Sequence, residues 1–130
     1  MEDITEAISR ALVDGQLLCA VAFEIAETLG VEPLQVGEEA DRLDVRLSHC
    51  QLGLFGWGPK AEGKYRRVKP LQEVPPELAA AIRAALGKDS RLACVHAWRI
   101  AAQFGIAKQT VADAAEGLEL RVSHCQLGAF

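Results

Sequence analysis

Apolar residues recur at helical spacing in several segments of the chain. Leu18, Val21, Ile25 and Leu29 lie three or four positions apart and would form one stripe along a helix. A similar spacing occurs near the start of the chain and again in its second half, so we expect two helices at the start of each half. These four predicted helices span residues 4–12, 17–29, 78–86 and 92–104.

A glycine follows the second predicted helix of each half, at Gly30 and Gly105. Glycine suits the left-handed residue that ends many helices, so we expect a tight turn there. A third helix should follow, over residues 33–42 and 108–116. Apolar and polar residues then alternate over residues 43–47 and 118–122, as in a half-buried strand. Each half is therefore predicted to run helix, helix, tight turn, helix, strand.

The two halves are copies of one another. Residues 14–55 align with residues 89–130 at a constant offset of 75, with 18 identities in 42 positions. The sequence therefore predicts a first repeat (1–55), a connector or wing (56–76) and a second repeat (77–130). A unit of about fifty residues is marginally stable alone, so the repeats should share an interface.

The predicted pair of helices around each glycine resembles the helix-turn-helix superfamily, of the winged or tri-helical kind found in bacterial regulators. Ala26, Gly30 and Val36 occupy the small, turn and core positions of that motif, and the second copy repeats them. The resemblance implies a mainly α protein with two tandem helix-turn-helix units. Each unit would end in a short strand, and a pseudo-two-fold would relate them. In this family the second helix reads DNA with its exposed N-terminal face.

Charge distinguishes the two copies. The chain has a net charge of −4, which divides into −8 for residues 1–55, +3 for residues 56–76 and +1 for residues 77–130. Phosphates would be repelled by the first copy. The second helix of its motif, predicted over residues 33–42, offers Glu32, Gln35, Glu38 and Glu39 on the face that would meet DNA. We therefore expect double-stranded DNA to meet the second copy and the connector.

The expected DNA contacts are basic or hydrogen-bonding residues, which suit phosphates and base edges. The connector would act as an arm or wing, with two short strands around its tip; a solvated linker is the alternative. The candidates are Lys108, Gln109, Thr110 and Arg99 in the second copy, and Lys60, Lys64, Arg66, Arg67 and Lys69 in the connector.

The favoured function at this stage is a small DNA-binding, transcription-regulating protein. The first alternative is a protein-interaction module whose acidic first half docks a basic partner, and a homodimer is also considered. The longest apolar run, residues 17–23, is too short for a bilayer, and the acidic start does not resemble a secretory signal. A cytoplasmic protein without a membrane partner is the expectation.

The hexapeptide Ser-His-Cys-Gln-Leu-Gly occurs twice, at residues 48–53 and 123–128. Thiolates and imidazoles suit zinc, copper(I) or an iron–sulfur centre, and a cysteine beside a histidine can sense oxidants. A metal- or redox-responsive protein is thus a further alternative. Its ligands would be Cys19, His49, Cys50, Cys94, His124 and Cys125.

The absence of a C-x-x-C pair weighs against zinc, and buried cysteines with polar anchors between the repeats explain the hexapeptides without any cofactor. We expect the two hexapeptide strands to lie at or near the interface between the repeats, where they could pair with each other, and His96 to be a helix-surface residue. No phosphate-binding glycine loop, G-x-S-x-G or H-E-x-x-H occurs, so the sequence does not predict an enzyme.

Overall fold

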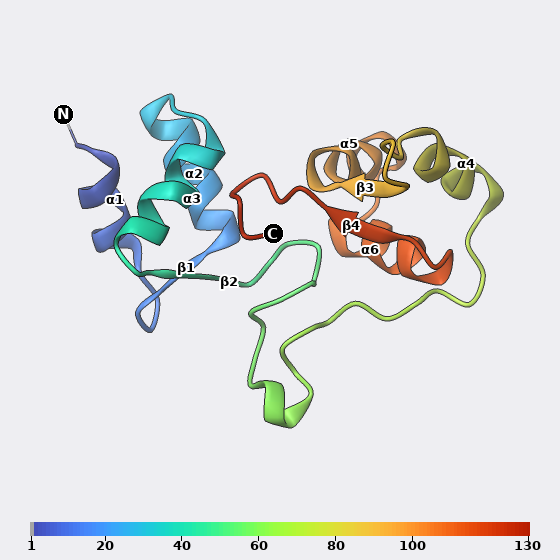
Figure 1. Cartoon of the computed structure of the whole chain (residues 1–130), viewed down its shortest axis with the longest axis horizontal. Coiled ribbons are helices and arrows are strands. Elements are labelled where there is room, and N and C mark those ends of the chain that lie inside the picture. The colour runs from blue at the N-terminus through green and yellow to red at the C-terminus, as the bar shows by residue number, and fades with distance from the viewer. Residues whose placement is uncertain (1) are drawn as a thin grey trace.

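The computed structural model describes residues 2–130 and is mainly helical, with short strands between the helices (Figure 1). The first half contains α1 (Ile4–Ala11), β1 (Gln16–Leu18), α2 (Cys19–Leu29), α3 (Pro33–Arg42) and β2 (Arg46–Ser48). The second half contains α4 (Pro76–Ala84), β3 (Arg91–Ala93), α5 (Cys94–Phe104), α6 (Lys108–Gly117) and β4 (Arg121–Ser123). The same order of elements therefore occurs twice, and from β1 onward the equivalent residues are 75 apart.

The glycine turns are confirmed. Gly30 and Gly105 end α2 and α5 in the left-handed conformation, with φ of 68° and 64°. Each glycine N–H donates to a carbonyl in the last turn of its helix, which satisfies groups that the helix end leaves open. The bounds of α3 match the prediction, and α6 extends one residue further.

The helices α2 and α5 begin at Cys19 and Cys94, two residues later than predicted. The residues before them form β1 and β3, two strands that the apolar spacing did not predict. Each strand pairs in parallel within its own half: β1 with β2, where Leu17 faces Leu47, and β3 with β4, where Leu92 faces Val122. Three residues are too few to establish a strand period, so pairing with a distant segment decides their conformation.

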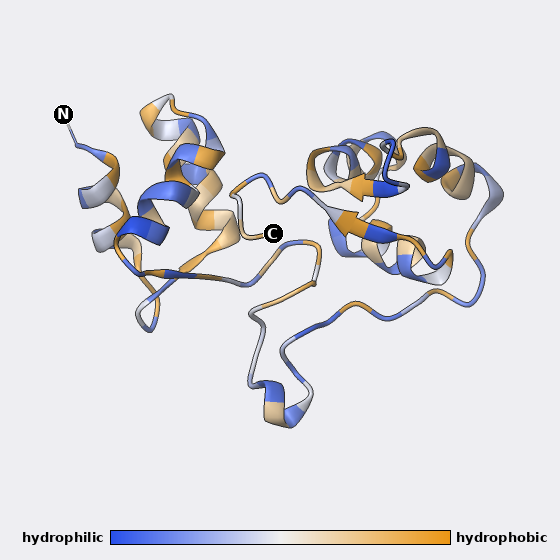
Figure 2. Ribbon diagram, in the orientation of Figure 1, coloured by the Kyte–Doolittle hydropathy of each residue, from blue (hydrophilic) through white to orange (hydrophobic). Residues whose placement is uncertain are grey.

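The predicted strands over residues 43–47 and 118–122 lie further along, at β2 and β4. Asp44 and Glu119 adopt φ of 59° and 62°, which interrupts an extended backbone. In Figure 2 the arrows of β3 and β4 each carry both hydrophilic and hydrophobic residues, as expected for short half-buried strands.

The hexapeptides do not form strands that pair with each other, so that prediction is wrong. His49 and His124 adopt φ of 51° and 52°, which ends β2 and β4, and a turn follows. In that turn Gly53 N–H donates to the Cys50 carbonyl at 2.8 Å, and Gly128 N–H donates to the Cys125 carbonyl at 2.9 Å.

The segments after these histidines, which we call exchange loops 50–55 and 125–130, each pack against the other half. Cys50 and Leu52 belong to the hydrophobic core around α4, α5 and α6, whereas Leu127 belongs to the core around α1, α2 and α3. Figure 1 shows the C-terminal segment (red) leaving β4 and reaching the helices of the first half. The two halves therefore complete each other's cores.

Aromatic residues at equivalent positions also meet between the halves. The rings of Phe55 and Phe130 are 6.2 Å apart and nearly perpendicular. Phe23 on α2 contacts Trp98 on α5, with 4.3 Å between ring centroids. Contacts of this kind add to the apolar area that the shared interface buries.

The connector, residues 56–75, forms a loop without strands, so the predicted strands of a wing are wrong. Its tip is a 3₁₀ turn, Lys60–Glu62. Backbone hydrogen bonds from Trp57 N–H to the Tyr65 carbonyl and from Lys64 N–H to the Pro59 carbonyl, both 3.2 Å, join its two sides. Val68 is buried against the second half, which anchors the returning chain. Within residues 2–130 no helix has the length and apolar character needed to cross a bilayer.

Candidate functional site

Five of the nine predicted DNA-contact residues line one groove between the connector and α6. Its volume is about 500 Å³, and no carboxylate lies in its wall. Positive charges gathered in a concave surface reinforce each other's field and attract anions. The groove is lined by Trp57, Gly63, Lys64, Arg66, Arg67, Lys69 and Gln109.

Trp57 organises this basic groove. Its indole N–H donates to the Cys50 carbonyl at 2.8 Å, which ties the ring to exchange loop 50–55. The Arg67 guanidinium lies 4.0 Å from the centroid of the indole, a favourable cation–π distance. Gln109 at the start of α6 donates to the Arg67 carbonyl at 3.2 Å. The groove is thus attached to the fold at both walls.

The remaining predicted contacts lie outside the lining. Lys60 lies over the Tyr65 ring at 4.6 Å, and Lys108 lies over the Trp98 ring at 4.5 Å. Thr110 is half-buried in the first turn of α6, and Arg99 is exposed on α5. The structure therefore gathers most of the connector cations with Gln109, and leaves Arg99 and Thr110 outside the groove.

The predicted exposed face of α6 is not exposed. Every residue of α6 is buried or half-buried, because the helix packs on α4 and α5 and the connector also runs along it. The Lys69 N–H donates to the Asp113 carboxylate at 3.0 Å, and the Leu71 N–H donates to the Asp113 carbonyl at 3.1 Å. An added Cβ at Gly117 would lie 2.3 Å from the Leu71 carbonyl oxygen, so the chain passes in close contact. The sequence did not predict that Asp113 and Gly117 contact the connector, because that role depends on tertiary structure.

The repeated cysteines are free thiols in apolar surroundings. Cys19, Cys50 and Cys94 are buried, and Cys125 is half-buried. Gln51 donates its side-chain amide to the Cys19 sulfur at 3.7 Å, and Gln126 does the same to Cys94 at 3.4 Å. This arrangement, the same in both halves, makes the glutamine a polar anchor for its exchange loop.

Burial raises the pKa of Cys19 from 9.0 to about 11, against the smaller, lowering effect of the Gln51 hydrogen bonds. Burial also raises the pKa of Cys50 and of Cys94. A buried thiol that stays protonated is a poor nucleophile and a poor metal ligand at neutral pH.

The histidines of the hexapeptides bond locally. His49 Nδ1 lies 2.9 Å from Ser48 Oγ, and its ring packs edge-on against Trp57. His124 Nδ1 lies 2.7 Å from Ser123 Oγ in the second copy. Over residues 2–130 no three or more cysteine, histidine or acidic side chains are grouped so as to hold a metal ion.

His96 is half-buried rather than on the surface, and its buried Nδ1 has no partner within residues 2–130.

The raised thiol pKa leads to a testable reactivity. At pH 7.5 the buried thiols should react with Ellman's reagent far more slowly than in unfolding concentrations of urea. For Cys19, a pKa raised from 9.0 to about 11 lowers the thiolate fraction about 100-fold. The unfolding free energy should also decrease as the pH rises from 9.0 to about 11, because the unfolded Cys19 loses its proton first. Four rapidly titrating thiols in the native protein would contradict this structure.

Comparison of the chain with protein-family models, with curated proteins and with solved structures found no match.

Proposed function

We propose that this chain is a small DNA-binding, transcription-regulating protein built on two tandem helix-turn-helix units related by a pseudo-two-fold. The observation that carries the proposal is the basic groove, which gathers Lys64, Arg66, Arg67 and Lys69 in one lining; Lys64 pairs with Glu62 and Arg66 with Glu116, both outside that lining. Four cations in one groove can neutralise phosphates of a DNA backbone, and phosphate contacts supply a large share of the affinity of such complexes.

The repeated order of elements supports the helix-turn-helix part of the proposal. A left-handed glycine and two further residues join α2 to α3, and the same number joins α5 to α6. Helices α2 and α3 pack together, as do α5 and α6. Because the connector covers α6, the proposal assigns DNA contact to the connector and the first turn of α6, rather than to the full face of a recognition helix.

The cations of the groove have different roles. Arg66 pairs with Glu116 at 2.7 Å, which neutralises part of its charge. Lys69 is exposed, and its ammonium forms no ion pair within residues 2–130. Arg67 is stacked on Trp57, and a stacked guanidinium is held in place for contact with a phosphate. Gln109 is the candidate for a base-edge contact, because glutamine can bond adenine in the major groove.

Fluorescence anisotropy with labelled double-stranded DNA tests the proposal. We expect binding that weakens steeply between about 50 and 200 mM salt, since each neutralised phosphate contributes about 0.9 to the slope of log K against log salt. The double variant Lys64→Ala/Arg67→Ala should therefore reduce that slope by about 2 and weaken binding about tenfold or more at low salt.

The matched control is Arg83→Ala/Lys88→Ala, which removes two exposed cations outside the groove. Its net charge therefore equals that of the Lys64→Ala/Arg67→Ala variant. Its DNA affinity should stay within about threefold of the parent, because surface charges far from the contact act only through the general field. Absence of binding at low salt, or an equal loss in both double variants, would overturn the proposal.

A further inference from the structure

Two grooves occupy equivalent places in the two halves. Each lies between the third helix of its half, the strand that follows, and the exchange loop of the other half. We call them the α3 groove, of about 570 Å³, and the α6 groove, of about 560 Å³. Equivalent acidic and arginine side chains line both. The pairs are Asp41 and Glu116, Asp44 and Glu119, and Arg46 and Arg121.

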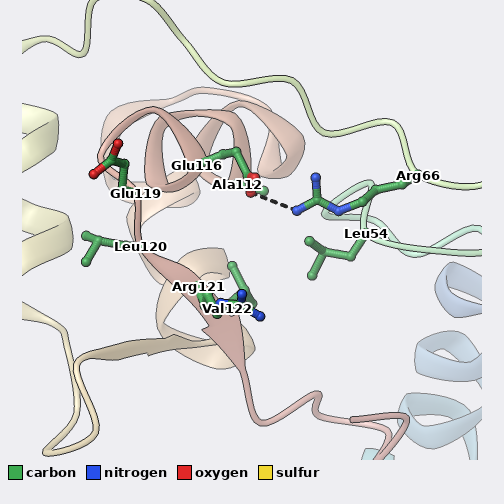
Figure 3. A pocket seen from close by; sticks show the side chains of 8 residues that line it. All are labelled: Leu54, Arg66, Ala112, Glu116, Glu119, Leu120, Arg121 and Val122. Carbon is green, nitrogen blue, oxygen red and sulfur yellow. Dashed lines mark hydrogen bonds and ion pairs between the residues drawn. The ribbon is translucent and has the colours of Figure 1, made fainter.

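The connector supplies a basic side chain to the α6 groove. Figure 3 shows Arg66 reaching from the connector to Glu116 on α6, where the ion pair measures 2.7 Å. The chain then continues along the same helix, where Asp113 accepts from the backbone N–H groups of Lys69 and Leu71. An extended basic segment, residues 66–71, is therefore held on α6 by two acidic residues one helical turn apart.

The α3 groove keeps the same acids, but no segment of residues 2–130 pairs with them as residues 66–71 pair with α6; Tyr65, Phe55 and residues 127–130 complete its lining. Glu38 and Asp41 occupy the positions of Asp113 and Glu116, both are exposed, and neither forms an ion pair within the described chain. Its wall also exposes apolar area: the exposed fractions of Leu34 and Phe130 are 48% and 46%, among the highest of the large hydrophobic residues. Helix α3 is open where α6 is covered.

We propose that the α3 groove binds an extended basic peptide segment of a partner protein, in the way that α6 binds residues 66–71. An arginine of the partner pairs with Asp41, a backbone N–H of the partner donates to Glu38, and apolar residues cover Leu34 and Phe130. The net charge of −8 on residues 1–55 steers such a segment toward the groove. This surface is separate from the basic groove, so the inference does not rest on DNA binding.

One difference between the grooves limits the length of the bound segment. Gly117 allows Leu71 to pass close to α6, whereas the equivalent residue on α3 is Arg42, whose side chain pairs with Glu39. A peptide on α3 therefore turns away one helical turn earlier. The contact comprises the residues that correspond to Arg66 through Lys69.

The probe for this inference is a fluorescein-labelled synthetic peptide with the sequence of residues 64–71, Lys-Tyr-Arg-Arg-Val-Lys-Pro-Leu. Titration with the full-length chain should give saturable binding at low salt. Glu38→Gln/Asp41→Asn should weaken it about tenfold, since the variant removes the two negative charges that the arginine and the backbone N–H of the peptide would contact. The control Glu24→Gln/Glu27→Gln makes the same charge change at exposed sites on α2, and should stay within about twofold.

Other outcomes overturn the inference. Loss of binding only in Asp113→Asn/Glu116→Gln would show that the peptide replaces the connector on α6. Equal loss in the α3 and α2 variants would show attraction to net charge alone. A mass that doubles with concentration, and that Glu38→Gln/Asp41→Asn returns to the monomer value, would assign the groove to a second copy of this chain. Because the α3 variants leave the basic groove intact, their DNA affinity reports separately on the proposed function.

Discussion

Truncation of Leu127 to alanine is expected to lower the free energy of unfolding by about 2–5 kcal/mol, the usual cost of removing a fully buried leucine side chain. Leu127 is 2% exposed and lies in the core of the first half, although the second repeat supplies it. Its removal therefore leaves a cavity between the halves rather than within one. Urea denaturation followed by circular dichroism and by tryptophan fluorescence measures the change.

Leu52→Ala should behave in the same way, because Leu52 is fully buried in the core of the second half. Each variant should unfold in a single transition with both probes, since each exchange loop couples the two cores. Val13→Ala is the control: Val13 is 48% exposed, so its truncation should change stability by about 0.5 kcal/mol or less. A cost below about 1 kcal/mol for Leu127→Ala would contradict the exchanged arrangement.

Gly37→Ala is expected to destabilise the protein, against the preference of helices for alanine. Helix propensity alone would favour alanine by about 1 kcal/mol. An added Cβ at Gly37, however, would lie 1.8 Å from the Leu127 carbonyl oxygen, a backbone atom that cannot move without displacing exchange loop 125–130. Steric conflict of this kind costs about 1–3 kcal/mol or more, so we expect a net loss of stability.

Chemical denaturation of Gly37→Ala beside Thr28→Ala separates the two effects. Thr28 is exposed on α2, where alanine acts through helix propensity and should be neutral or slightly stabilising. A Gly37→Ala variant that is more stable than the parent would mean that exchange loop 125–130 does not lie against α3. The equivalent residue on α6 is Ala112, which is 2% exposed, so the second half already accommodates a methyl group there.

Local spacing identified much of the fold. The apolar stripe of α2, the glycines that end α2 and α5, and the proline that begins α3 are properties of short segments, and local interactions decide them. The charge of the basic connector residues was enough to predict them as DNA contacts. Five of the nine predicted contact residues then proved to share one groove.

The features that the sequence did not predict depend on contacts between distant segments. Strands β1 and β3 exist because parallel partners some thirty residues away bond to them. The burial of α6 depends on Asp113, whose carboxylate gives no local sign that it holds the connector. Trp98 on α5 meets Phe23 on α2, and helical periodicity does not specify that neighbour.

By itself, the sequence of this protein determined that similar chain segments would form twice, because identical residues at a constant offset have the same local preferences. Tertiary structure alone decided that each copy gives its exchange loop to the other, and that the connector covers α6 while α3 stays open. The physical reason is that local preferences act within a few residues, whereas the partner of an apolar or charged surface is chosen among all the surfaces that the folded chain brings together.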